Sequence, residues 1–185
     1  MLSVGAMYTR DIYNVVQKNM NEKAPSGTYN EQPGRVYWTK NNYYDNPKTK
    51  TVIQLTNGDE KGYQYSFNAV LTKKFDFGFT GSFGYTYTMA KDMTANPGSS
   101  AASVWQNNVA VNSLNDPGVS YSLFSTPHRL IANASYEVAY ANMKTTVSLF
   151  YTGYQQGRFS YTYSNDMNGD GNYSAYASKD CQIGR

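Results

Sequence analysis

The segment from Phe77 to Met89 alternates large apolar and small polar side chains over 13 residues. A period of two is typical of a β-strand and not of a helix. At roughly 3.3 Å per residue and a tilt of about 40°, such a strand can cross the hydrocarbon core of a bilayer, whereas an ordinary globular strand has about 5 or 6 residues. The pattern therefore predicts a membrane-spanning barrel strand.

Four further segments share this pattern, with apolar or aromatic residues on one parity and small or polar residues on the other. They are Leu2–Ile12, Lys61–Lys73, His128–Val138 and a run from Met143 that can extend through Phe159 to Tyr163. The residues out of pattern are Val70, Ile131 and Phe150. Together the runs predict an all-β fold, namely an antiparallel transmembrane β-barrel fragment with about five or six long strands of a larger barrel.

Composition is compatible with this fold. The mean hydropathy of −0.63 does not exclude a barrel, because each strand shows lipid only every second residue. The 19 tyrosines and 8 phenylalanines suit the boundary between acyl chains and water. A net charge of +3 is too small to imply a nucleic-acid partner, and a single cysteine, Cys181, excludes an internal disulfide or a thiolate metal cluster.

The connections between the runs alternate in length. Tight turns at Lys73–Asp76 and Ala139–Asn142 alternate with long segments at about residues 19–60 and 90–127. Outer-membrane barrels have short turns on the periplasmic side and long loops outside. We therefore expect residues 1–185 to be part of one β-barrel domain with two surface loops.

The first long loop is expected to contain a short hairpin formed by Arg35–Lys40 and Lys50–Thr56, the second of which could instead extend the next strand. Five strands cannot close a cylinder, and unpaired edge groups facing lipid cost several kcal/mol each. No secretory signal precedes the first run. We expect a fragment of a longer protein in the cell outer membrane, in contact with outer-membrane lipid and with the remaining strands of its barrel.

Short motifs recur in a characteristic order along about two thirds of the chain. They are Asp59 to Tyr63, Asn115-Asp116-Pro117, Tyr121-Ser122, Pro127-His128-Arg129, Ser148 to Tyr151, Phe159 to Tyr163, and Asp166 with Asn168 to Gly171. This order resembles the C-terminal barrel region of TonB-dependent outer-membrane receptors, in particular the Oar-like branch. The Ile/Tyr-rich run with which that family continues is replaced here by residues 175–185.

The resemblance implies a barrel of about 22 strands whose lumen is filled by an N-terminal plug. In such receptors an external ligand binds to the loops and the plug, and the TonB complex pulls on a short N-terminal segment to admit it. Neither the plug domain nor that segment is present in these 185 residues. The remaining strands, the plug and the TonB complex are therefore the expected protein partners.

A possible cation site follows the last run. Asp166, Asn168 and Asp170 form the Asp-x-Asn-x-Asp-Gly opening of an EF-hand calcium loop, in which oxygens at alternate positions surround a hard cation. The position of the bidentate glutamate is occupied by Ala177. The sequence leaves two readings open, a calcium site and an exposed Asn/Asp/Gly turn.

Aromatic residues of the long loops are candidate ligand contacts, because flat rings with polar edges stack on sugars and peptides. These candidates are Tyr37, Trp38, Tyr43, Tyr44 and Trp105. Loop packing would use the same residues.

His128 is the only histidine, and we expect it to have a structural or interfacial role. Arg129 and Glu137 share the lumen-facing parity. They could form ion pairs with the plug or with neighbouring strands, or they could simply be part of a polar lining.

No catalytic motif is found, and we do not expect an enzyme. The first hypothesis is a fragment of a ligand-gated outer-membrane transporter. The alternative is a soluble β-sandwich module that binds a ligand, of the carbohydrate-binding or adhesin type, in which the apolar parity faces a second sheet. A small closed adhesin barrel needs at least about eight strands. Strand length, loop asymmetry and motif order favour the transporter.

Overall fold

The computed structural model describes residues 1–30, 35–39, 42–44 and 51–172. The described strands are antiparallel, and the described residues contain one short helix besides them. The fold is therefore all-β, as predicted. The chain divides into two compact units. The sheet unit comprises Met1–Thr9, Tyr63–Ala90 and Phe124–Gly157, and the loop unit comprises the described parts of Arg10–Gly62, Lys91–Leu123 and Arg158–Arg185.

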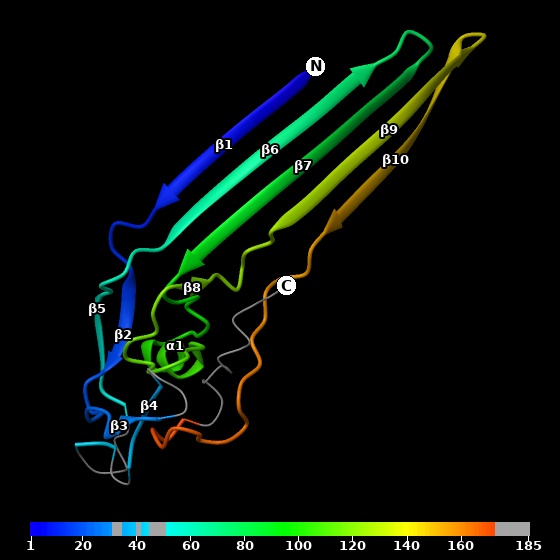
Figure 1. The fold of residues 1–185 in the computed structure, drawn as a ribbon. Coiled ribbons are helices and arrows are strands. Elements are labelled where there is room, and N and C mark those ends of the chain that lie inside the picture. Colours follow the sequence, from blue (N-terminus) through cyan, green and yellow to red (C-terminus); the bar gives the residue numbers. More distant parts are fainter. Residues whose placement is uncertain (31–34, 40–41, 45–50, 173–185) are drawn as a thin grey trace. The chain divides into compact units, whose positions relative to one another are not determined.

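Five long strands form the sheet unit. They are β1 (Leu2–Arg10), β6 (Tyr63–Lys74), β7 (Phe79–Asp92), β9 (His128–Tyr140) and β10 (Met143–Tyr154), in the order β1-β6-β7-β9-β10 (Figure 1). These strands lie where the alternating runs predicted them. The predicted extension of the last run through Tyr163 is wrong, because the partner strand β9 begins after Pro127, which has no N–H to continue a ladder.

The two tight turns lie at one end of these strands. Residues 75–78 connect β6 to β7, and Ala141 with Asn142 connects β9 to β10. Gly78 has a φ of 89°, and a Cβ at this position would lie 2.4 Å from the carbonyl oxygen of Glu137 on the neighbouring strand. Only glycine fits this close approach without a shift of the backbone.

The strand registers place the apolar parity of the sheet on one face. Residues directly opposite each other project to the same side. The register between β7, β9 and β10 gives the rows Phe79–Tyr136–Val147, Gly81–Ala134–Leu149 and Phe83–Ala132–Tyr151. Met1 and Thr72 exchange backbone hydrogen bonds, which sets Leu2 opposite Leu71 in the β1–β6 pair. The ring centroids of Tyr65 on β6 and Tyr87 on β7 lie 6.2 Å apart, so the five runs share a single apolar face.

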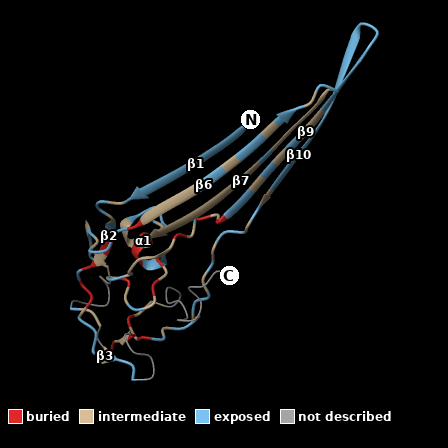
Figure 2. Ribbon diagram, turned by 45° about the horizontal axis from the view of Figure 1, so that its top comes forward, coloured by how far each residue is buried: buried red, intermediate tan, exposed pale blue. Residues whose placement is uncertain are grey.

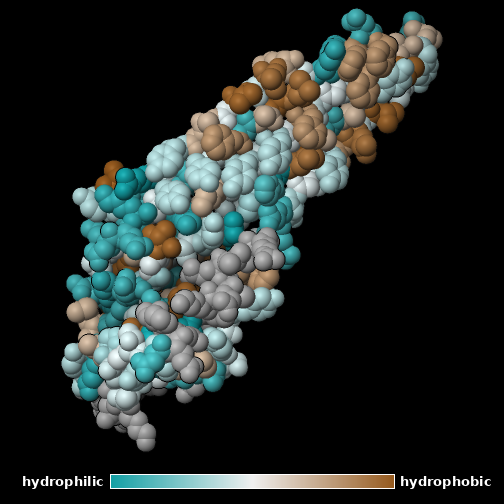
Figure 3. Space-filling model, in the orientation of Figure 1, coloured by the Kyte–Doolittle hydropathy of each residue, from teal (hydrophilic) through white to brown (hydrophobic). Residues whose placement is uncertain are grey.

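Nothing described in the sheet unit covers this face. Val4 is 73 % exposed and Leu149 is 73 % exposed, and the strands are coloured as exposed or intermediate along almost their whole length (Figure 2). In the space-filling view, strongly hydrophobic side chains gather over the long strands (Figure 3). Within the described ranges, every buried hydrophobic side chain belongs to the loop unit. The sheet unit is a single layer.

The loop unit contains two short antiparallel ladders. β2 (Val15–Asn19) pairs with β5 (Ile53–Asn57), and β3 (Gly27–Thr28) pairs with β4 (Val36–Tyr37). The predicted hairpin between residues 35–40 and 50–56 is therefore wrong, because each half pairs with an earlier segment; residues 40 and 50 lie outside the described ranges. Pairing β5 with β2 directs Ile53 to the core of this unit.

The core of the loop unit is assembled around a short helix. In α1 (Ala101–Asn107), Ser100 caps the N-terminus by accepting the N–H of Ser103 at 3.3 Å. Trp105 is packed with Ala110 and Leu114, and Ile53 lies against this cluster. A two-residue strand, β8 (Ser120–Tyr121), pairs with the end of β7. No described helix is long and apolar enough to cross a membrane.

Asn115 ties the core to β2 through three hydrogen bonds. Its Oδ1 accepts the backbone N–H of Asn19 at 2.6 Å and the indole N–H of Trp105 at 2.9 Å, while its Nδ2 donates to the carbonyl oxygen of Asn19 at 3.1 Å. Asn19 and Trp105 are 1 % and 2 % exposed. Water cannot replace these contacts without opening the core.

Replacing Asn115 with alanine is expected to destabilise the loop unit by about 3 kcal/mol, because three buried polar groups lose a partner. Both tryptophans belong to this unit, so tryptophan emission during denaturant unfolding reports on it alone. Asn112→Ala is the matched control, since Asn112 is exposed on the same connection. Equal unfolding midpoints for the two variants would contradict a structural role for Asn115.

Candidate functional site

Two of the five aromatic candidates are buried. The side chain of Trp38 is 6 % exposed and its indole N–H donates to the carbonyl oxygen of Lys23 at 2.8 Å. Trp105 is 2 % exposed and lies in the core. Rings enclosed in this way have no free face for a sugar or a peptide. In this structure both indoles stabilise the loop unit.

The tyrosine candidates are more accessible. Tyr44 is 70 % exposed, and the ammonium group of Lys23 lies 6.0 Å from its ring centroid. Tyr37 is half-buried and its ring centroid lies 5.1 Å from that of Tyr29. Ligand contact by these rings stays a prediction. Tyr43 instead directs its hydroxyl group to the acidic loop described next.

The acidic loop, residues 166–172, is ordered by its own first carboxylate. Asp166 accepts the backbone N–H groups of Gly169, Asp170 and Gly171 at 2.8, 3.1 and 2.9 Å. Asp170 in turn accepts the N–H of Asn172 at 2.8 Å and is fully buried. The loop is thus a compact turn whose backbone donors point at Asp166.

A segment far away in sequence joins this loop. Glu22 and Tyr43 form an antiparallel bridge, supported by a hydrogen bond of 2.7 Å from the N–H of Lys23 to the carbonyl oxygen of Asn42. Directly opposed residues project to the same side. Tyr43 donates its hydroxyl to the carbonyl oxygen of Asp170 at 3.0 Å. The Glu22 side chain therefore projects toward the side on which Asp170 lies.

The electrostatics of the cluster are dominated by burial. Burial raises the pKa of Glu22 from its usual 4.5 to about 8, and the nearby charge of Asp170 adds to the effect. Burial also raises the pKa of Tyr43 to about 12, with smaller contributions from the negative charges of Asp170, Glu22 and Asp166. The region therefore disfavours additional negative charge and favours a proton or a cation.

Buried oxygen atoms remain without partners in this cluster. Oε1 of Glu22 is buried and has no hydrogen-bond partner within the described part of the chain. Asn168 is 3 % exposed, and its Oδ1 and Nδ2 are likewise buried without a hydrogen-bond partner among the described residues. Among the described residues, no three His, Cys, Asp or Glu side chains form a group ready to hold a metal. Any cation here would need amide or main-chain oxygens as well.

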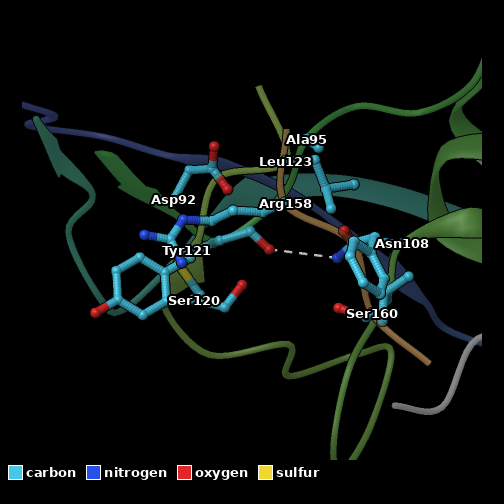
Figure 4. A pocket seen from close by; sticks show the side chains of 11 residues that line it. Asp92, Ala95, Asn108, Ser120, Tyr121, Leu123, Arg158 and Ser160 are labelled. Atoms are coloured by element: carbon cyan, nitrogen blue, oxygen red, sulfur yellow. Dashed lines mark hydrogen bonds between the residues drawn. The ribbon is translucent and has the colours of Figure 1, made fainter. Parts of the chain in front are cut away.

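A second polar site lies elsewhere in the loop unit. The guanidinium of Arg158 lies over the ring of Tyr121, 3.8 Å from its centroid, and Asp92 lines the same small pocket (Figure 4). Asn108 on its other side donates to the carbonyl oxygen of Met93 at 3.3 Å. Stacking fixes the planar cation against the aromatic face. This arrangement is structural, with a cavity of about 40 Å³ that suits one or two water molecules.

The remaining candidates lie in the sheet unit. His128 Nδ1 is 2.6 Å from the hydroxyl of Tyr85, and its ring centroid is 5.2 Å from that of Tyr87, so it packs among tyrosines at the start of β9. Glu137 forms a 3.0 Å ion pair with Lys144 of the neighbouring strand. Both side chains of this pair are well exposed, so it contributes at most about 1 kcal/mol.

Sequence reasoning missed two residues of these sites. Glu22 lies in a stretch without alternation, and nothing in its neighbours indicates that it meets residues about 150 positions later. Arg158 lies within the predicted extension of the last strand, so the sequence did not indicate a separate role for it. A long-range β-bridge and a cation–π contact have no local sequence signal. Ala177 and Cys181 lie outside the described residues.

Comparison with known proteins found no match: no family model, no curated protein and no solved structure is significantly similar to this chain.

Glu22 predicts a pH dependence of the loop unit in buffer free of divalent cations. Because the folded state holds the Glu22 proton more tightly than the unfolded chain, stability is expected to fall as the pH rises from about 4.5 to about 8 and then to level off. The acidic groups facing Glu22 are Asp170 and, through Tyr43, Asp166. Denaturant unfolding followed by tryptophan emission measures this slope.

Glu22→Gln is expected to remove most of that slope, because an amide of the same shape does not ionise. Asp59→Asn, which changes an exposed carboxylate of the same unit, is expected to leave the slope in place. A wild-type stability that rises between pH 5 and pH 8 would contradict the placement of Glu22 as a buried acid.

Proposed function

We propose that this chain supplies five strands to an outer-membrane β-barrel, and that the barrel belongs to a TonB-dependent receptor that takes up an external ligand. The apolar face of the sheet unit would contact lipid, and the polar parity would face the lumen. The loop unit would lie outside the bilayer and contribute to ligand binding. The proposal is carried by one observation, an exposed apolar face on a single layer of long strands.

Aromatic residues at both ends of this face support the proposal. Phe79 and Tyr136 share a row near the tight turns, whereas Tyr87 and His128 share a row near the other end. Of the rows between them, Gly81–Ala134–Leu149 lacks an aromatic ring, whereas Phe83 and Tyr151 flank Ala132 and Tyr85 lies opposite Leu130. Membrane barrels carry such aromatic girdles at both lipid–water interfaces.

The distance between the girdles also fits a bilayer. Tyr87 lies eight positions after Phe79, which is about 27 Å along an antiparallel strand and about 21 Å across the membrane at a tilt of about 40°. An outward apolar band on a membrane barrel is about 25 Å tall. A globular sheet of ordinary size has no need for strands of 12 to 14 residues.

The receptor class depends on the sequence motifs. The Asn-Asp-Pro, Pro-His-Arg and Asn-Gly-Asp-Gly segments occur in the order typical of the Oar-like branch. β1 and β10 are the edges of the sheet, and in a bilayer their free N–H and C=O groups require further strands. The plug and the TonB-binding segment would belong to the same full-length protein.

An arginine scan of one strand tests which face meets lipid. Leu149 and Ser148 are neighbours on β10, both exposed, and point to opposite faces. In lipid vesicles, Leu149→Arg is expected to destabilise the inserted sheet by about 2–4 kcal/mol, whereas Ser148→Arg is expected to be tolerated. The readout is the fraction of the full-length protein, with its remaining barrel strands, that stays protected from protease in the vesicles.

Nitroxide labels at the same two positions separate the membrane sheet from a soluble sandwich. A lipid-facing label at position 149 should collide with oxygen, which dissolves in the bilayer, more often than with a polar nickel complex. The label at position 148 should show the reverse preference. Inaccessibility of position 149 to both reagents would indicate a covering protein layer and would refute the proposal.

The genomic sequence upstream of Met1 tests the receptor class separately. We expect it to encode a plug domain in the same reading frame. A stop codon directly upstream, followed by a functional ribosome-binding site, would contradict a TonB-dependent receptor and leave the membrane sheet to be explained by another barrel protein.

A further inference from the structure

We propose that the acidic loop binds a calcium ion together with Glu22, which supplies the carboxylate that the loop itself lacks. The Asp-x-Asn-x-Asp-Gly pattern alone does not make a site, since its glutamate position holds Ala177. In the fold, Glu22 reaches the loop through its bridge to Tyr43. The inference concerns the loop unit alone and holds whether or not the sheet spans a membrane.

The unpartnered oxygens point to a ligand. Burying a polar group without a hydrogen bond costs about 1–3 kcal/mol in proteins, and a carboxylate costs more. Here the carboxyl oxygen Oε1 of Glu22 and the amide of Asn168 are both more than nine-tenths buried without a partner in the described residues. A hard cation between them would satisfy both oxygens at once.

The ligand set suits calcium. Calcium takes six to eight oxygens, drawn from carboxylates, amide and backbone carbonyl groups and water, in flexible geometry. Glu22, Asp170 and Oδ1 of Asn168 provide two carboxylates and one amide oxygen, and backbone carbonyls or waters complete the shell. Magnesium, which demands a rigid octahedron, fits such a set less well.

Asp166 acts as a positioning residue for this site. Its carboxylate accepts three backbone N–H groups of the loop, which turns the chain so that Asn168 and Asp170 become buried. The ion would therefore fasten the acidic loop to the segments around Glu22 and Tyr43. These segments are about 150 and 130 residues apart from it in sequence, so the ion would act as a cross-link within the loop unit.

Calorimetric titration of the 185-residue chain with calcium chloride tests the proposal, in detergent micelles and with tryptophan emission confirming a folded loop unit. One site is expected, with a dissociation constant on the order of 10⁻⁴–10⁻³ M, as in extracellular calcium modules. Glu22→Gln is expected to weaken binding by about tenfold or more, because it keeps the shape and removes one negative ligand. Asp59→Asn should bind as the wild type does.

Hydrogen exchange locates the ion independently of affinity. Calcium is expected to increase protection of residues 21–23 and 166–172 in the wild type and not in Glu22→Gln. The absence of calcium binding by the folded wild-type chain would overturn the proposal. So would equal affinity of wild type and Glu22→Gln, because the ion would then lie elsewhere.

Discussion

The sheet unit depends on one constraint, a large apolar face that its own residues do not cover. Alternation with a period of two, continued over five strands in matched register, gathers the apolar parity on one side. Such a face is stable in water only when another layer removes it from solvent, and patches above a few hundred Å² mark interaction surfaces. We propose lipid as the covering phase, because the tyrosine and phenylalanine rings on this face suit an interface.

The loop unit is stabilised in a different way. It has a small core around Trp105 and a network of buried polar contacts centred on Asn115 and Asn19. Where apolar burial is limited, satisfied polar groups fix the arrangement of segments that are distant in sequence. In the Glu22 cluster, by contrast, Oε1 of Glu22 and Oδ1 of Asn168 are buried without a hydrogen-bond partner among the described residues.

The long strands could be predicted from the sequence because their signal is local. A period of two along β7 or β9 needs only the residues of that strand, and matched parities together with the tight turns then restrict the registers. The interior of the long loops could not be predicted in the same way. β2 pairs with β5 and β3 with β4 across separations that short apolar runs do not encode, and Trp38 and Trp105 lacked any pattern that distinguishes a core ring from an exposed one.

The acidic loop shows the same difference between local and long-range sequence signals. The sequence pattern located Asp166, Asn168 and Asp170 because ligands at alternate positions form a local motif. It did not locate Glu22, whose approach depends on a single bridge to Tyr43 and on the hydrogen bond from Tyr43 to Asp170. Under the proposal above, the fold completes a motif that is incomplete in the sequence. In a loop unit with so small an apolar core, a cation shared by two distant segments would contribute stability that hydrophobic burial does not supply.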